Sequence, residues 1–117
     1  MKDNIERFLP LSPAALHVLL ALAGGELHGY GIMLEVARQS DGQYKLGPGT
    51  LYDNLRKLMT QGIVEESRKQ PWGEDSRRRY YRLTGLGRRV LSAEVARLEG
   101  VLREARSLLH APKPRRA

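Results

Sequence analysis

Cysteine is absent from this 117-residue chain, and its absence excludes two kinds of structure. The fold can contain neither a disulfide nor a metal site built from thiolates, and we expect a protein of the reducing cytoplasm. Long apolar runs are also missing, because no stretch approaches the roughly 20 residues that span a bilayer. The first residues lack the charged and then apolar pattern of a secretory signal. We therefore expect no association with a membrane.

Candidate catalytic and metal-binding residues are equally sparse. The three histidines, His17, His28 and His110, stand far apart, and none has a second ligand-type residue four positions further on. No glycine-rich phosphate loop follows a strand-like run. The serines and aspartates show no setting that resembles a catalytic triad. The sequence therefore predicts no enzyme, no metal and no cofactor.

Positive charge is what the chain has in excess, with a net charge of +7, and this charge is localised. The segment 67–89 holds two acidic residues and eight basic ones: Arg68, Lys69, Arg77, Arg78, Arg79, Arg82, Arg88 and Arg89. The rest of the excess lies in the tail, in Lys113, Arg115 and Arg116. A localised basic patch is typical of proteins that bind a polyanion, because phosphate contacts release counterions. A solvated charged face is the alternative, but such faces usually mix both signs.

Residues 46–64 predict one short amphipathic helix, about 48–61. Pro48 suits a first helical turn, and Gly62 can supply a left-handed C-terminal cap. Leucines 51, 55 and 58 recur at helical spacing and predict a buried stripe. The candidate DNA contacts lie on the rest of the helix: Gly49, Thr50, Tyr52, Asp53, Arg56 and Lys57. Such a helix can enter a DNA major groove, where Asp53 could accept from cytosine N4. An ordinary surface helix is the alternative.

A basic hairpin is predicted next in the chain. Residues 63–67 and 79–83 are strand-like, and the polar stretch between them contains Pro71 and Gly73. We expect this wing, residues 63–83, to contact phosphate or the minor groove through Lys69, Arg77, Arg78 and Arg79. Trp72, the only tryptophan, falls at the predicted tip. Its ring is expected to fold over its own hairpin, and contact with a DNA sugar or the minor groove is the alternative.

The first half of the chain predicts a scaffold. Ser12 can cap a helix that ends at the two glycines 24 and 25, and His17 is its only polar residue. A helix that is apolar nearly all round is buried on most sides. A second helix follows, for which we expect Tyr30 to face the core with its hydroxyl at the surface; a phosphate contact is the alternative.

The last predicted helix runs from a cap at Thr84 to about His110, some 26 residues or about 39 Å. Its apolar residues are spaced as a heptad seam, namely Leu91, Val95, Leu98, Leu102, Ala105 and Leu109. A helix of this length extends past the reach of a small domain. We therefore expect the seam to form a homodimer, and the alternative is a helix folded back on the first one.

Four motifs in this order resemble the PadR-like transcriptional regulators, over roughly residues 12–91. They are Leu27-His28-Gly29-Tyr30, the run 47–52 (Gly-Pro-Gly-Thr-Leu-Tyr), the helix end at 58–64, and the run 78–84 (Arg-Arg-Tyr-Tyr-Arg-Leu-Thr) followed by Gly87-Arg88. The chain is similar to the short form of this family, with a single C-terminal dimerisation helix. One departure is Asp53, where relatives often carry proline or a small residue.

The resemblance implies a mainly α-helical fold with a small two-stranded antiparallel wing, that is, a winged helix-turn-helix followed by a long C-terminal helix. The expected parts are a DNA-binding domain at 1–84, a dimerisation helix at 85–111 and a flexible basic tail at 112–117. The expected function is a sequence-specific DNA-binding regulator that acts as a homodimeric repressor on double-stranded DNA. A small-molecule effector is left open, and the sequence identifies none. The alternative is an effector-free module that binds nucleic acid or a partner without operator specificity.

Overall fold

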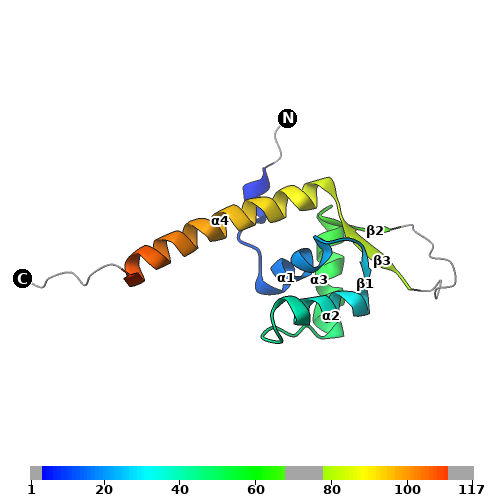
Figure 1. Cartoon of the computed structure of the whole chain (residues 1–117). Coiled ribbons are helices and arrows are strands. Elements are labelled where there is room, and N and C mark those ends of the chain that lie inside the picture. The colour runs from blue at the N-terminus through cyan, green and yellow to red at the C-terminus, as the bar shows by residue number, and fades with distance from the viewer. Residues whose placement is uncertain (1–3, 68–77, 111–117) are drawn as a thin grey trace, which may run out of the picture.

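The computed structural model describes residues 4–67 and 78–110, which form a small body from which one long helix projects (Figure 1). In chain order the elements are η1, a 3-10 helix (Ile5–Phe8), α1 (Pro13–Leu22), β1 (Leu27–His28), α2 (Gly29–Gln39), α3 (Pro48–Thr60), β2 (Val64–Ser67), β3 (Tyr80–Leu83) and α4 (Gly85–His110). The predicted contact residues Lys69 and Arg77, Trp72 and the tail at 112–117 lie outside the described residues. Within the described ranges no helix has the length and apolar character needed to cross a bilayer.

Three predicted helix ends are confirmed by their geometry. Ser12 caps α1, because its hydroxyl accepts from the backbone N–H of Ala15 at 3.1 Å. Thr84 caps α4 in the same way and accepts from the N–H of Gly87 at 2.9 Å. Gly62, just after α3, has a φ of 78°, in the left-handed region that favours glycine. These local signals place the helices where the sequence predicts them.

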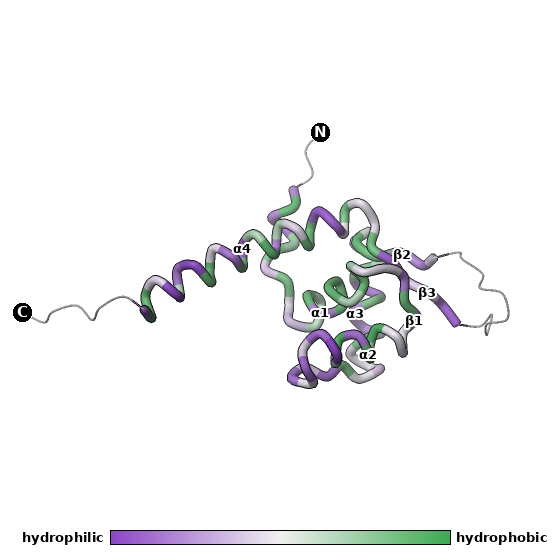
Figure 2. The backbone as a smooth tube through the Cα atoms, viewed as in Figure 1, coloured by the Kyte–Doolittle hydropathy of each residue, from purple (hydrophilic) through white to green (hydrophobic). Residues whose placement is uncertain are grey.

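The core lies between α1, α2, α3 and the sheet, and the first turns of α4 cover it. Figure 2 shows α1 as a largely hydrophobic segment at the centre of this body. Its Val18, Leu19 and Leu22 are almost completely buried, which confirms that this helix is enclosed on most sides. Full burial of one such side chain is worth about 1.5–3 kcal/mol.

The sheet has three strands instead of the two expected, in the order β1-β3-β2. β2 and β3 form the predicted antiparallel hairpin, in which Val64 lies opposite Leu83. The additional strand is β1, whose Leu27 pairs with Tyr81. A strand of two residues is too short to show alternation of polar and apolar residues, so no sequence pattern marks it. The fold class, mainly helical with a small antiparallel sheet, is confirmed.

The first turn of α4 packs closely against the turn between α3 and β2. A β-carbon on Gly87 would overlap the carbonyl oxygen of Ile63. The same carbonyl accepts from the backbone N–H of Thr84 at 3.1 Å and from its hydroxyl at 3.2 Å. Only glycine permits such an approach, and the contact holds the start of α4 against the body.

Glu94 connects α4 to the segment before α1. Its side chain is only 1% exposed, which is unusual for a carboxylate. Its Oε2 accepts from the N–H of Leu11 at 3.1 Å, and Arg97 donates to both carboxylate oxygens at 2.7 and 3.0 Å. The hydrogen bond from Arg97 lowers the pKa of Glu94, against burial, which raises it; the Leu11 N–H lowers it further. No local sequence pattern predicts this arrangement, because Leu11 and Glu94 lie 83 positions apart.

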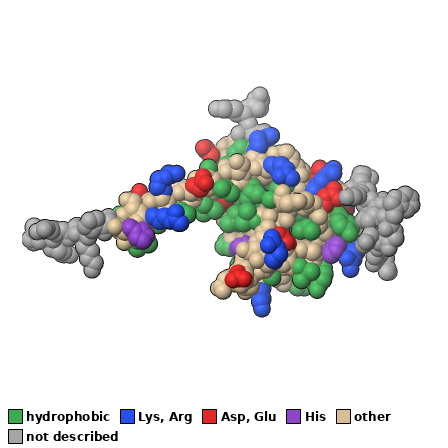
Figure 3. Space-filling view, viewed as in Figure 1, with side chains coloured by type: hydrophobic (Ala, Val, Ile, Leu, Met, Phe, Trp, Pro, Cys, Tyr) green, Lys and Arg blue, Asp and Glu red, His purple; other side chains and the backbone are tan. Residues whose placement is uncertain are grey.

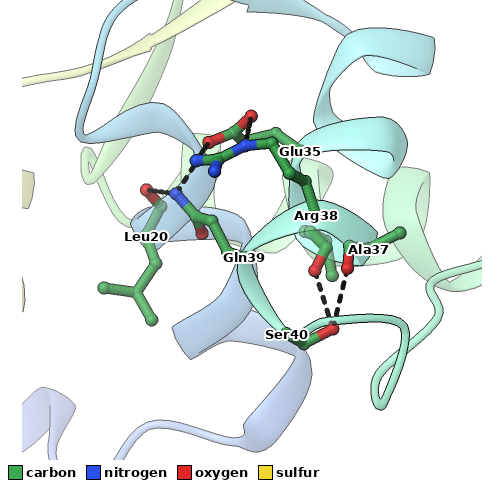
Figure 4. A network of polar contacts seen from close by, with 7 residues as sticks. Leu20, Glu35, Ala37, Arg38, Gln39 and Ser40 are labelled. Carbon is green, nitrogen blue, oxygen red and sulfur yellow. Dashed lines mark hydrogen bonds and ion pairs between the residues drawn. The ribbon is translucent and has the colours of Figure 1, made fainter.

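A polar network fixes the C-terminal end of α2 to α1 (Figure 4). Gln39 donates to the carbonyl of Leu20 at 3.1 Å and to the carboxylate of Glu35 at 3.0 Å. Arg38 donates to the same carboxylate, and this hydrogen bond lowers the pKa of Glu35. The Ser40 hydroxyl donates to backbone carbonyls of the last helical turn, at 2.9 and 3.4 Å. The bond from Gln39 to Leu20 thus joins the end of α2 to α1, and the other bonds hold the last turn of α2 together.

Candidate nucleic-acid interface

The outward face of α3 contains all six residues that the sequence predicts as contacts on this helix. Leu51, Leu55 and Leu58 are buried in the core, so the opposite face is turned to solvent. The exposed residues are Gly49, Thr50, Tyr52, Asp53, Arg56 and Lys57. Small and hydroxyl-bearing groups stand at the N-terminal end, the end that meets base edges in helix-turn-helix proteins. The chain thus presents a polar helix face that fits a major groove.

Asp53 has basic partners within its own helix. Its carboxylate lies 3.2 Å from Nη1 of Arg56 and 3.5 Å from Nζ of Lys57. More than half of each of these side chains is exposed, so the pairs are weak and can be exchanged for other partners. Asp53 therefore offsets the positive charge of two candidate DNA contacts in the free chain.

The basic hairpin mixes charges more than its sequence suggests. Glu65 lies opposite Arg82 in the β-ladder, and the two form an ion pair at 2.8 Å. Arg79 pairs with Glu66 at 3.2 Å. The expectation of a single-sign patch was therefore wrong for this part of the wing. Its physical reason is the antiparallel pairing, which brings the two glutamates of β2 beside arginines far away in the sequence.

Among the described residues, Arg78 differs from these neighbours because it contacts a histidine and not a carboxylate. Its Nη1 lies 2.8 Å from Nε2 of His28. The other ring nitrogen of His28, Nδ1, accepts from the N–H of Gly31 at 3.0 Å and caps α2. His28 therefore stands at the start of α2 as its N-cap. Its approach to Arg78, 50 positions away, was missed.

A cleft of about 310 Å³ opens where α2, α3 and β3 meet. It is lined by His28, Gly29, Tyr30, Tyr52, Arg78, Arg79 and Tyr81. The hydroxyl of Tyr52 occupies the space beside Gly29 that a β-carbon would need. Tyr81 is buried, and burial raises the pKa of its phenol, with Tyr52 and Glu66 raising it further. The described walls of this cleft thus carry two arginines and no carboxylate.

Tyr30 is 59% exposed, so the expectation that it faces the core was wrong. It stands beside Gly29 at the first turn of α2, where the following buried residue is Ile32. The helix phase that buries Ile32 and Val36 turns Tyr30 outward. The alternative of a phosphate contact therefore remains open for Tyr30.

The distal half of α4 projects from the body (Figure 1). Its apolar side chains are largely exposed. Leu102 is 48% exposed and Leu109 is 80% exposed, while Val95 and Val101 are also exposed. Leu98 and Ala105 are partly buried. In Figure 3, hydrophobic side chains gather on the body beside this helix. The alternative of a helix folded back on α1 is wrong for this distal half.

Leu91, the first residue of the predicted seam, requires a correction. It is buried in the core of its own chain, because it lies where α4 still covers the body. The stripe that another molecule could reach therefore begins at Val95. In the described ranges no cluster of three or more metal-ligand side chains is found.

Comparisons with known proteins agree with this architecture. The model of the "Transcriptional regulator PadR-like family" matches residues 18–93. Transcriptional regulator Rv3488 of Mycobacterium tuberculosis is 35% identical over 89 residues, covering 76% of this chain and 78% of that protein. A 37.1 kDa protein in transposon TN4556 of Streptomyces fradiae is 40% identical over 90 residues; the match covers 74% of this chain and only 24% of that protein.

Solved structures are similar in fold. A transcriptional regulator from Clostridium thermocellum has a TM-score of 0.68 at 22% identity, covering 92% of this chain and 96% of that one. Bacillus subtilis PadR in complex with operator DNA has a TM-score of 0.64 at 21% identity, covering 92% of this chain and 54% of that one. The matched family region spans α1 from Val18, α2, α3, the sheet and the start of α4. This chain belongs to the PadR-like family of transcriptional regulators.

Proposed function

We propose that this chain is a sequence-specific DNA-binding regulator that represses transcription as a homodimer. In this proposal α3 lies in the major groove and reads bases through Thr50, Asp53 and Arg56, while Arg78 and Arg79 contact the backbone. The observation that carries it is the outward face of α3, where six small or polar residues are exposed above a leucine stripe locked into the core. The Bacillus subtilis relative, whose structure contains operator DNA, supports the same use of this fold.

The homodimer rests on the projecting part of α4. Apolar side chains that stay in water cost free energy, roughly 25 cal/mol for each Å² of accessible surface left uncovered. Leu102 and Leu109 lie beyond the reach of the body and have no cover within the described chain. A second copy would supply the same stripe in return, as twofold interfaces do. Two α3 helices would then face DNA about one helical turn apart.

This assembly gives each part of the chain a separate role. We propose a DNA-binding domain at 1–84, a dimerisation helix at 85–111 and a basic tail at 112–117 that adds charge. The proposed setting is the cytoplasm, where bacterial DNA is accessible. A chain without cysteine fits this reducing compartment. The wing residues Lys69 and Arg77 belong to the same backbone-contacting group by their charge.

The experiment that tests this function is selection of bound duplexes from a random-sequence pool by the purified full chain. The enriched duplex and a scrambled copy are then titrated at one fixed salt concentration. A regulator should prefer the enriched duplex by about 10³ or more. A preference below about tenfold would instead support a module that binds nucleic acid without operator specificity. Thr50→Ala should change the preferred sequence, whereas Arg88→Gln, on α4, should not.

A further inference from the structure

The His28 ring cannot satisfy both of its close contacts as a hydrogen-bond acceptor. A neutral imidazole has one N–H and one acceptor nitrogen. When Nδ1 accepts from Gly31, the ring proton is on Nε2, and that N–H then faces the guanidinium of Arg78 at 2.8 Å. When Nε2 accepts from Arg78 instead, the cap on α2 is lost. In either tautomer, one of the two hydrogen bonds of the His28 ring is therefore not formed.

Arg78 thus lines the cleft with a histidine as its contact, and not with an acidic side chain. Its neighbours Arg79 and Arg82 each pair with a carboxylate of β2, at 3.2 and 2.8 Å. In the described part of the chain no carboxylate pairs with Arg78. A guanidinium offers five N–H donors in a planar fork that matches the oxygens of a phosphate. Because Arg78 lines this cleft, an anion bound there could accept from its remaining donors.

The rest of the cleft suits the same ligand. Tyr30 is exposed and lines the cleft beside Arg78, and its hydroxyl can donate a hydrogen bond. Tyr52 also lines the cleft and comes from α3, the helix that carries the candidate base contacts. The buried Tyr81 of β3 completes the aromatic lining. An anion here would lie between α2 and α3, next to the predicted reading face.

We propose that this cleft binds one phosphodiester of the DNA backbone, through Arg78 and the Tyr30 hydroxyl, and that His28 holds Arg78 until the phosphate replaces it. The inference rests on the proposed function, since DNA supplies the phosphodiester. It makes His28 a competitor of the phosphate for Arg78 and adds Tyr30 to the contact set. Binding in the cleft is favoured because Arg78 exchanges its contact with His28 for a charge-assisted hydrogen bond to the phosphate.

The test uses the full chain and a mixed-sequence 30-base-pair duplex at several salt concentrations. Arg78→Gln should weaken binding about tenfold and lower the salt slope by about one. Tyr30→Phe should weaken it about threefold, and the double variant should weaken it by less than the product, because both groups hold one phosphate. Arg88→Gln, which removes the same charge from α4, is the matched control and should have the smaller effect.

His28 is tested with His28→Asn, because asparagine keeps the cap on α2 and removes the ring nitrogen that faces Arg78. Since the ring and the phosphate compete, this variant should bind the duplex at least as tightly as the native chain. Several-fold weaker binding by a folded His28→Asn variant would overturn the competition. Fully multiplicative effects of Arg78→Gln and Tyr30→Phe would overturn the shared phosphate.

Three further outcomes distinguish the possible sources of the anion and separate this proposal from the proposed function. If inorganic phosphate shifts the NMR signals of the cleft tyrosines while Arg78→Gln leaves duplex affinity unchanged, the cleft is a free-anion site and the proposal is wrong. If Arg78→Gln and Tyr30→Phe weaken the mixed-sequence duplex but no enriched operator exists, the phosphate site stands and operator specificity fails. If an operator is bound normally by both variants, specificity stands and the phosphate site fails.

Discussion

The hydroxyl of Tyr52 lies where a β-carbon on Gly29 would stand, so the first residue of α2 and the outward face of α3 interlock. The contact explains why a glycine precedes Tyr30 at the start of α2. It also fixes the position of Tyr52 at the junction of the reading face and the phosphate cleft. The position of the Tyr52 ring on the outward face of α3 therefore depends on a residue of another helix.

Gly29→Ala should displace the Tyr52 ring, because the overlapping atoms are the far end of that side chain. Since an exposed ring can move, the free energy of unfolding should fall by no more than about 1–1.5 kcal/mol. Binding to a mixed-sequence duplex should weaken several-fold. Thermal unfolding and fluorescence anisotropy measure the two effects. Gly31→Ala is the control, because a β-carbon there meets only ordinary contacts at 3.4 Å and beyond. Equal DNA affinity of both variants would contradict the role given to Gly29.

Gly87→Ala should act on stability instead. Its β-carbon would meet the backbone carbonyl of Ile63, which cannot move without disturbing the turn after α3. A loss of about 1–3 kcal/mol in the free energy of unfolding is expected from such overpacking. Gly100→Ala, on the same helix with open space around it, should be neutral or slightly stabilising. Urea unfolding compares the two, and similar stabilities would show that α4 does not depend on this approach.

Local chemistry made much of this fold predictable. Several features depend only on residues close together in the sequence. They are the caps at Ser12 and Thr84, the left-handed Gly62 and the leucine stripe of α3. They are sufficient to place the helices, the hairpin and the outward face of α3. The order of these elements then indicated the family.

The features that sequence analysis missed depend on residues far apart in the chain. β1 pairs with a strand more than 50 positions away, and His28 reaches Arg78 across the same gap. Glu94, a charged residue on an amphipathic helix, would ordinarily face solvent, yet it is buried because Leu11 and Arg97 satisfy its oxygens. Periodicity fixes which residues share a face, and it does not say where another segment covers that face.

Glu94 should make stability depend on acid pH. Its folded-state pKa is lowered, so the stabilisation is complete above the unfolded pKa of about 4.3 and is lost as the pH falls through the folded value. At pH 7, Glu94→Gln should lower the free energy of unfolding by about 1–3 kcal/mol. As the pH is lowered from 5, the free energy of unfolding of this variant should fall less than that of the native chain. Chemical unfolding across this range measures both. Glu99→Gln, exposed on the same helix, should follow the native curve. An unchanged pH dependence in Glu94→Gln would rule out this ion pair as its source.

Asp53→Asn should strengthen binding to a mixed-sequence duplex several-fold. The change removes a carboxylate near the phosphates and frees Arg56 and Lys57 from their pairs at 3.2 and 3.5 Å. The preference between sequences should narrow at the same time, by about 1–3 kcal/mol at one base pair, if Asp53 accepts from a cytosine. Titrations of the enriched duplex and its single-base variants measure both quantities. Weaker binding to every duplex would contradict this account of Asp53.

Leu102→Asp combined with Leu109→Asp should convert dimers into folded monomers. Both side chains are exposed in the single chain, so the body should keep its native circular dichroism. Analytical ultracentrifugation gives the mass, and Ser107→Asp, on the opposite side of α4, is the matched control. A double variant that remains dimeric would place the interface elsewhere.

Methylation interference on the enriched duplex tests the central claim most directly, because a methyl group on guanine N7 blocks the major groove alone. If two copies of α3 read DNA, binding should be blocked at two short patches with centres about 10 base pairs apart, and Thr50→Ala should alter the pattern within both. Interference that is absent from the major groove, or confined to one patch, would contradict a homodimer that reads its operator through α3.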